Sequence, residues 1–176
     1  MKKSFLLFVA IAGLSLTFNQ PLLAQESQDV KKLFYAELSG PGMIMSANFD
    51  SRFNPNTVLG LGYRLGAGFA IKTDSEPERI TKTYYSFPVG LNYLFGQPHS
   101  NFIFEVGAGV SFLTRKVSLY TYSGNEKQGR MVGFASFMYR YMPVDGGFSF
   151  RVGFTPIIGT AGDLFPMAAI GFGYAF

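Results

Sequence analysis

The sequence predicts an all-β protein, folded as an eight-stranded antiparallel up-and-down β-barrel that spans a membrane. Three observations lead to this prediction. Eight runs alternate apolar residues with polar or small ones at a period of two, the small-residue face of these runs carries few charges, and long connections alternate with short ones. No segment after the first 24 residues shows the apolar stripe of an amphipathic helix, which would repeat every 3.6 residues.

The first residues form a segment of a different kind. Lys2 and Lys3 precede an apolar stretch that leads to the small residue Ala24. This order is typical of a secretory signal peptide. A membrane-anchoring helix is the alternative, but about 15 apolar residues are fewer than the roughly 20 that a spanning helix needs. We expect residues 1–24 to be a cleaved signal peptide and residues 25–176 to form the barrel domain.

Composition limits the partners of this domain. Removing 24 of 176 residues leaves 152, enough for one domain, with 13 basic and 11 acidic side chains that form no run. A nucleic-acid partner is therefore not expected. The chain has no cysteine, which excludes disulfides. A lipid-anchored protein would need a cysteine directly after the cleavage site, where Gln25 stands instead, so we expect no lipid anchor. We expect no cofactor.

The first four alternating runs occupy residues 33–39, 43–53, 60–69 and 85–95. Each has an apolar face opposite a face of small and polar residues. The apolar faces hold Phe34, Ala36 and Leu38, then Met43, Met45, Ala47, Phe49 and Phe53, then Leu61, Tyr63, Leu65, Ala67 and Phe69, then Tyr85, Phe87, Val89, Leu91, Tyr93 and Phe95.

The remaining runs occupy residues 101–112, 131–141, 148–156 and 168–176. Three of them are regular, with apolar faces formed by Phe102, Phe104, Val106, Ala108, Val110 and Phe112, by Phe148, Phe150, Val152 and Phe154, and by Ala168, Ile170, Phe172, Tyr174 and Phe176. The run 131–141 is less regular, because Val132, Phe134 and Met138 share the parity of Arg140. For this run, the sequence leaves open which face points into the barrel.

The composition of the second face distinguishes a membrane barrel from a soluble barrel or sandwich. A soluble barrel such as a lipocalin keeps its apolar face inside, so its outer face carries many charged residues. Here the second face is mostly glycine, alanine, serine and asparagine, which suits the narrow interior of an eight-stranded barrel. In "GLGYRLGAGF", residues 60–69, the glycines leave room for Arg64, and the apolar face is expected to meet lipid. The glycine spacing does not match a dinucleotide-binding loop.

Connection lengths give an orientation. Residues 72–83 and 114–129 form long connections, whereas "GQPHS" and "MPVDGG" are short and rich in turn-forming residues. Outer-membrane barrels have long external loops and short periplasmic turns. The two long connections are therefore predicted to be external, and His99 in "GQPHS" to be periplasmic.

The signal peptide, the eight alternating strands and the ending "GYAF" resemble small outer-membrane β-barrel proteins of the OmpA, OmpX and OmpW type. The resemblance implies localisation in the bacterial outer membrane and contact with outer-membrane lipid. It also implies that Tyr174 and Phe176 are similar to the signal that the barrel-assembly machinery reads during insertion. The resemblance covers residues 30–176, and only the ending is a motif.

Five charged residues are candidates for a network in the barrel interior: Glu37, Arg64, Glu105, Arg140 and Arg151. Charges in a narrow interior must pair or meet water, because an isolated buried ion costs several kcal/mol. Two interpretations follow. The network is either a salt-bridged plug that sets strand register or a constriction that selects ions.

Enzymatic chemistry is not expected. Barrel hydrolases use a histidine near the outer rim, and the single histidine, His99, is predicted at the other end. One histidine and no cysteine also leave no metal site. The sequence therefore predicts a non-enzymatic outer-membrane barrel with a structural or surface-interaction role through its long external loops and an unknown extracellular ligand. The alternative is a small pore or conduit for ions or hydrophobic solutes.

Overall fold

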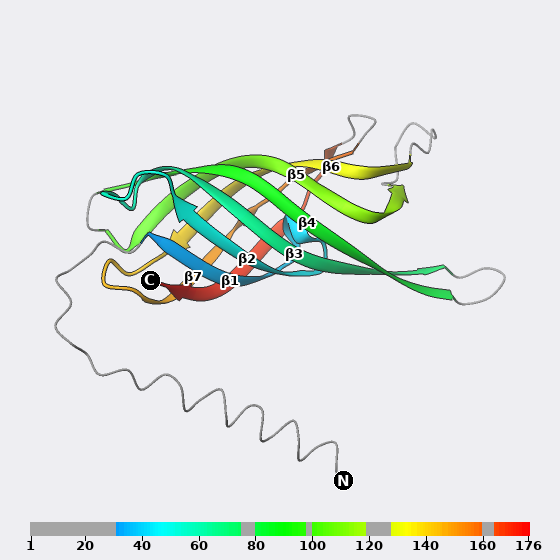
Figure 1. Cartoon of the computed structure of the whole chain (residues 1–176), viewed down its shortest axis with the longest axis horizontal. Helices are drawn as coiled ribbons and strands as arrows, with labels where there is room; N and C mark the ends of the chain where they lie inside the picture. The colour runs from blue at the N-terminus through cyan, green and yellow to red at the C-terminus, as the bar shows by residue number, and fades with distance from the viewer. Residues whose placement is uncertain (1–30, 75–79, 98–99, 119–127, 160–163) are drawn as a thin grey trace, which may run out of the picture.

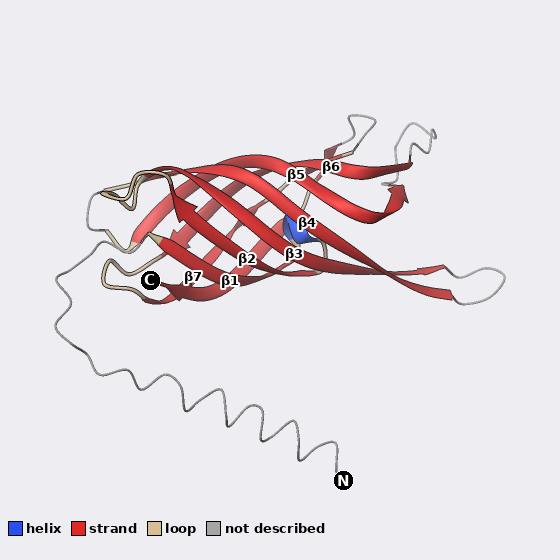
Figure 2. Ribbon diagram, in the orientation of Figure 1, coloured by secondary structure: helices blue, strands red, loops and turns tan. Residues whose placement is uncertain are grey.

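The structure is a computed structural model that describes residues 31–74, 80–97, 100–118, 128–159 and 164–176. The predicted signal peptide and His99 lie outside these residues. The described chain forms a β-barrel of oblique strands (Figures 1 and 2). The eight long strands are β1 (Lys32–Leu38), β2 (Met45–Arg52), β3 (Gly60–Asp74), β4 (Ile80–Phe95), β5 (Phe102–Ser118), β6 (Gln128–Tyr141), β7 (Gly147–Phe154) and β10 (Ala168–Ala175). The short elements are the 3₁₀ turn η2 (Gly40–Gly42), β8 (Ile157–Ile158) and β9 (Leu164–Phe165).

The barrel closes through its first and last strands. Each long strand pairs antiparallel with its neighbours, and β1 pairs with β10 from Leu33↔Ala175 to Leu38↔Ile170. Lys32 and Phe176 extend this seam by exchanging backbone hydrogen bonds of 3.0 and 2.9 Å. The predicted fold class, an eight-stranded antiparallel up-and-down barrel, is confirmed.

The predicted facing is also observed. On β1, Phe34 is exposed and Glu37 is buried, as the alternation requires. On β6, Val132, Phe134 and Met138 point inward together with Arg140. These bulky side chains fit because the facing strands carry glycine. The ring of Phe134, for example, lies against Gly90 and Gly109.

The two long connections are shorter than predicted, because the strands continue into them. β3 and β4 stay paired to Asp74↔Ile80. β5 and β6 pair to Phe112↔Met131 and, after a shift of register, again from Val117↔Gly129 to Ser118↔Gln128. Most of the predicted loop 72–83 is therefore a β-hairpin arm, which projects away from the end where the C-terminus lies (Figure 1). The alternation of apolar residues on β3 stops after Ile71, but backbone pairing with β4 continues to Asp74↔Ile80.

Met43 was predicted on the outer face of a strand, and this prediction is wrong. β2 begins only at Met45, because residues 40–42 turn into the barrel as η2. Ser39 and Met43 flank this turn with φ values of 63° and 76°. Met43 consequently packs against an apolar cluster inside the barrel.

No helix among the described residues is long and apolar enough to cross a membrane.

Candidate functional site: the charged barrel interior

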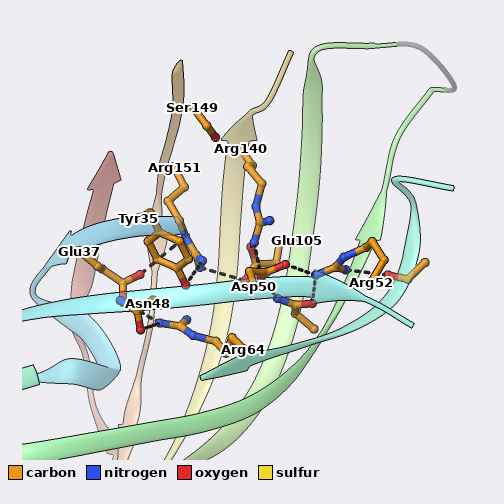
Figure 3. A network of polar contacts seen from close by, with 12 residues as sticks. Tyr35, Glu37, Asn48, Asp50, Arg52, Arg64, Glu105, Arg140, Ser149 and Arg151 are labelled. Carbon is orange, nitrogen blue, oxygen red and sulfur yellow. Dashed lines mark hydrogen bonds and ion pairs between the residues drawn. The ribbon is translucent and has the colours of Figure 1, made fainter. Parts of the chain in front are cut away.

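Seven charged side chains meet inside the barrel, from six different strands (Figure 3). Each lies at an inward position of its strand and is at most 7% exposed. They are Glu37 of β1, Asp50 and Arg52 of β2, Arg64 of β3, Glu105 of β5, Arg140 of β6 and Arg151 of β7. The alternation of the strands is what directs all of them to one place.

The first part of the network centres on Asp50. Its two carboxylate oxygens bind different arginines: Oδ1 pairs with Arg52, and Oδ2 accepts a hydrogen bond from Arg140 at 3.0 Å. The Asn92 amide donates to Asp50 and accepts a hydrogen bond of 2.5 Å from Arg52. Arg52 also donates to the carbonyl of Gly60 at 3.0 Å. Asp50 is thereby held between β2, β4 and β6.

The second part centres on Glu105 and Glu37. Glu105 Oε2 pairs with Arg140, and its Oε1 accepts a hydrogen bond of 2.9 Å from Arg151. Arg151 Nε lies 3.6 Å from Glu37 Oε1. The other Glu37 oxygen accepts a hydrogen bond of 2.7 Å from Arg64. Each of these carboxylates therefore bridges two arginines.

The seven residues form one alternating chain of charges. Its order is Arg52, Asp50, Arg140, Glu105, Arg151, Glu37 and Arg64. Four arginines face three carboxylates, so an arginine stands at each end. Arg64 compensates for its single carboxylate partner with Asn48 Oδ1 at 3.3 Å and with the rings of Tyr35 and Phe134, whose centroids lie 5.7 and 5.5 Å from its Cζ.

Tyr35 contacts Arg151, which lies in the middle part of this row of alternating charges. Its hydroxyl accepts a hydrogen bond of 2.5 Å from Arg151, and the Arg151 guanidinium also lies 4.6 Å from the centre of the ring. Donors still exceed acceptors. Nε and Nη1 of Arg64 and of Arg140, and Nε of Arg151, have no hydrogen-bond acceptor among the described residues. With four arginines and three carboxylates, these seven side chains also carry one positive charge in excess.

Apolar clusters lie on both sides of the charged chain. Towards the end where β1 begins and β10 ends, the cluster comprises Leu33, Tyr35, Leu94, Ile103, Met142 and Ala175, with Val58 and Leu59. Towards the other end it comprises Leu113, Val132, Phe134 and Ile157, with Met43 and Met167.

The turn η2 adds to the packing on this second side. The Ser111 hydroxyl donates to the carbonyl of Pro41 at 2.7 Å, and the Ser86 hydroxyl donates to that of Gly42 at 2.9 Å. The β1–β2 connection is thus held inside the barrel by β4 and β5.

The structure brings together all five residues that the sequence suggested for this network. Sequence reasoning missed Asp50 and Arg52, together with their neutral partners Asn48 and Asn92. The signal was present, because Ser46, Asn48, Asp50 and Arg52 share one parity. Among the described residues, no group of three His, Cys, Asp or Glu side chains is arranged to hold a metal ion.

Five tyrosines lie near one end of the barrel, whereas other exposed aromatic side chains, such as Tyr85 and Phe112, lie towards the other end. Tyr63, Tyr93, Tyr139, Tyr141 and Tyr174 all lie towards the end that carries Lys32 and Phe176. Ring contacts link them to neighbours, such as Tyr63 to Phe53 with centroids 5.5 Å apart and Phe104 to Tyr139 at 5.2 Å. Tyr174 and Phe176 are exposed beside the closing seam. Recognition of these two residues by the barrel-assembly machinery stays a prediction.

Comparison with known proteins bears on the fold. No family model matches the sequence, and no curated protein matches it. The N-terminal β-barrel domain of Pseudomonas aeruginosa OprF has a similar structure, with a TM-score of 0.52 over 86% of this chain and 100% of that domain, at 14% identity. The chain has the fold of the small eight-stranded outer-membrane barrels. This confirms the resemblance stated above at the level of the fold.

A second solved structure is less similar. It is Ail, the attachment invasion locus protein of Yersinia pestis, in complex with the heparin analogue sucrose octasulfate. Its TM-score is 0.44 at 12% identity, over 84% of this chain and 97% of that chain.

Proposed function

We propose that this chain is a non-enzymatic integral protein of the bacterial outer membrane, with a plugged interior and two charged hairpins that act in surface interactions. The observation that carries the proposal is the inversion of the barrel: seven charges are buried inside, while large apolar side chains cover the outside. This apolar outer surface is far larger than the apolar patches that soluble monomers expose to water. In a bilayer it is the expected surface.

The apolar surface runs around the whole barrel. Every long strand contributes to it, as Phe34 on β1, Phe104 on β5 and Phe172 on β10 illustrate, each about half exposed. The end with the five tyrosines carries Lys32 and Phe176 and has the short connections 53–59, 96–101 and 142–146. By the usual orientation of outer-membrane barrels this end faces the periplasm, and the β3–β4 and β5–β6 hairpins face outward.

The interior supports a plug better than a conduit. Arg64, Arg140 and Glu105 are at most 1% exposed and joined in one chain of ion pairs. An ion crossing the barrel would have to separate these pairs, which leaves buried charges without partners at a cost of about 3–5 kcal/mol each. The apolar clusters and η2 would also have to move.

Single-channel recording in a planar bilayer tests the plug. Insertion is first verified by the heat-dependent gel shift of a folded barrel. We expect a clear shift and no discrete openings, for the native protein and for Asp145→Asn, which changes a charge in an exposed turn. Discrete, salt-dependent openings that change with Arg64→Ala would replace the plug with the alternative function, a small conduit.

Replacing either hairpin with a two-residue turn tests the surface role. We expect variants lacking residues 72–83 or 114–129 to keep the heat-dependent gel shift, because the buried side chains nearest to these segments on β4 and β5, Tyr84 and Leu113, are retained. Cells that express them should lose adhesion to matrix-coated surfaces. A matched control shortens the turn 54–57 at the other end, which should leave adhesion unchanged. Loss of folding, or unchanged adhesion in both hairpin variants, would contradict the surface role.

A further inference from the structure

The short strands β8 and β9 continue β7 and β10. The pair Phe154↔Ala168 ends the β7–β10 ladder, and Ile158↔Leu164 follows in β8–β9 without a change of register. Between them, the amide of Thr155 donates to the carbonyl of Met167 at 2.7 Å. On its other side, β8 pairs with β6 in the register that β7 already has. The hairpin is therefore one structure, interrupted near two prolines that lack the amide hydrogen a ladder needs.

The outward face of this hairpin stays apolar as far as Ile158 and Leu164. Along β10 and β9 the outward positions are Ile170, Ala168, Pro166 and Leu164, and all four are exposed. Leu164 is 63% exposed, the largest value among the exposed large hydrophobic residues of the described chain. Ile157 points inward and is buried. The alternation thus continues through β8, whereas in β9 both Leu164 and its neighbour Phe165, at 48%, are exposed.

The height of the wall shows why this continuation matters. At about 3.3 Å per residue and a tilt of about 45°, β7 and β10 with eight residues each rise only about 19 Å. The apolar band of an outer-membrane barrel is about 25 Å tall. Counted through β8 and β9, residues 147–158 and 164–175 rise about 28 Å by the same estimate. Only with the extension does this side of the barrel match the band.

The top of the β1–β2 hairpin borders this extension and has the same character. β1 ends at Leu38, so the residues of β10 and β9 above Ile170 have no partner on β1. Leu38, Ile44 and Met45 are exposed there. No charged residue occurs between Leu38 and Met45, and only Asp163 between Thr155 and Met167, whereas residues 72–83 contain six charged side chains.

We propose that the β8–β9 extension and the top of the β1–β2 hairpin bind the acyl chains of the outer leaflet, so that β8 and β9 are part of the lipid-facing wall. The proposal rests on the proposed membrane location. The surface is continuous with the apolar outer face of β10, and its height and its low number of charged residues are those of a membrane-embedded segment. The barrel is consequently asymmetric, with charged hairpins on the β3–β6 side and an immersed rim on the other.

Tryptophan fluorescence tests this proposal, because the chain has no tryptophan and a single substitution gives a unique signal. Leu164→Trp reports on the extension. Phe172→Trp reports on the outer face of β10, and Asn56→Trp reports on an exposed turn at the other end. Each variant is refolded into phosphatidylcholine vesicles with or without bromine atoms on the acyl chains, and folding is checked by the heat-dependent gel shift. Ile158→Trp replaces Leu164→Trp if the latter does not fold.

We expect Leu164→Trp to emit at shorter wavelength than Asn56→Trp and to lose emission to brominated lipid about as strongly as Phe172→Trp does. Quenching by acrylamide but not by brominated lipid would overturn the proposal, provided that Phe172→Trp is quenched by brominated lipid. Protection from both quenchers would indicate a protein neighbour and would also overturn it. If Phe172→Trp itself escapes brominated lipid, the membrane location fails, and the proposal fails with it.

Discussion

Asp50 and Arg140 lie 90 residues apart in the chain, yet Asp50 Oδ2 accepts a hydrogen bond from Arg140 across the barrel at 3.0 Å. This contact joins β2 to β6, two strands that do not pair with each other. A shift of either strand by one residue would turn its charged side chain towards the outer surface. The contact therefore opposes register slips that backbone hydrogen bonds alone would tolerate.

Removing a bridging carboxylate should destabilise the barrel strongly. Glu105→Gln takes one charged partner from both Arg140 and Arg151 and leaves four buried arginines against two carboxylates. We expect a loss of about 3–5 kcal/mol in the free energy of unfolding, because Arg140 and Arg151 are buried and each loses one of its two carboxylate partners. Urea unfolding in vesicles measures it. The control Asp145→Asn should change stability by less than about 0.5 kcal/mol, and an equal loss in both variants would contradict the prediction.

Removing a terminal arginine should cost less. Arg64→Met deletes the last cation of the chain and brings the interior to three arginines and three carboxylates. Glu37 keeps Arg151 as a partner at 3.6 Å, and the methionine side chain can still contact Tyr35 and Phe134. We expect a loss of about 1–2 kcal/mol, within the usual range of point substitutions. A loss equal to that of Glu105→Gln would show that the excess positive charge is not a source of strain.

Two glycines of the barrel wall should respond differently to alanine. A Cβ at Gly109 would overlap the carbonyl oxygen of Val89 and lie 2.6 Å from Gly90 Cα and from Phe134 Cζ, whereas at Gly133 the nearest atom is 3.5 Å away. We expect Gly109→Ala to lower the free energy of unfolding by about 1–3 kcal/mol, because the packed interior cannot yield. Gly133→Ala should be nearly neutral. Equal melting temperatures of the two variants would contradict this prediction.

The inward turn η2 should loosen when its two hydroxyl donors are removed. Ser86→Ala with Ser111→Ala deletes the hydrogen bonds to Gly42 and Pro41, each worth about 1 kcal/mol. Amide hydrogen exchange at Met43, whose amide donates to Gly40, should accelerate, while exchange in β4 stays slow. Ser149→Ala, which removes a buried hydroxyl on β7, is the control. Unchanged exchange at Met43 would mean that packing alone holds the turn.

Much of the interior could be predicted from parity. Glu37, Arg64, Glu105 and Arg151 each occupy the small-residue face of a regular run, which is a local property of the chain. Asp50 and Arg52 follow the same rule and could have been included. Their partners could not be predicted, because the pairs Asp50–Arg140 and Arg64–Glu37 depend on strand order, register and barrel closure, which are set by contacts between distant segments.

The sequence by itself determined that the strands alternate, because side-chain direction in a strand depends only on residue parity. The composition of the small-residue face, with its few charges, then predicted that the apolar faces point outward and that the charges gather inside. Only the tertiary structure decided that Gly40–Gly42 turns into the barrel, that the β3–β4 hairpin extends to Asp74↔Ile80, and that β8 and β9 continue the wall. The physical reason is that these features are stabilised by neighbouring strands, such as Ser111 on β5 holding Pro41 and β6 pairing with Ile157. Local composition carries no record of such neighbours.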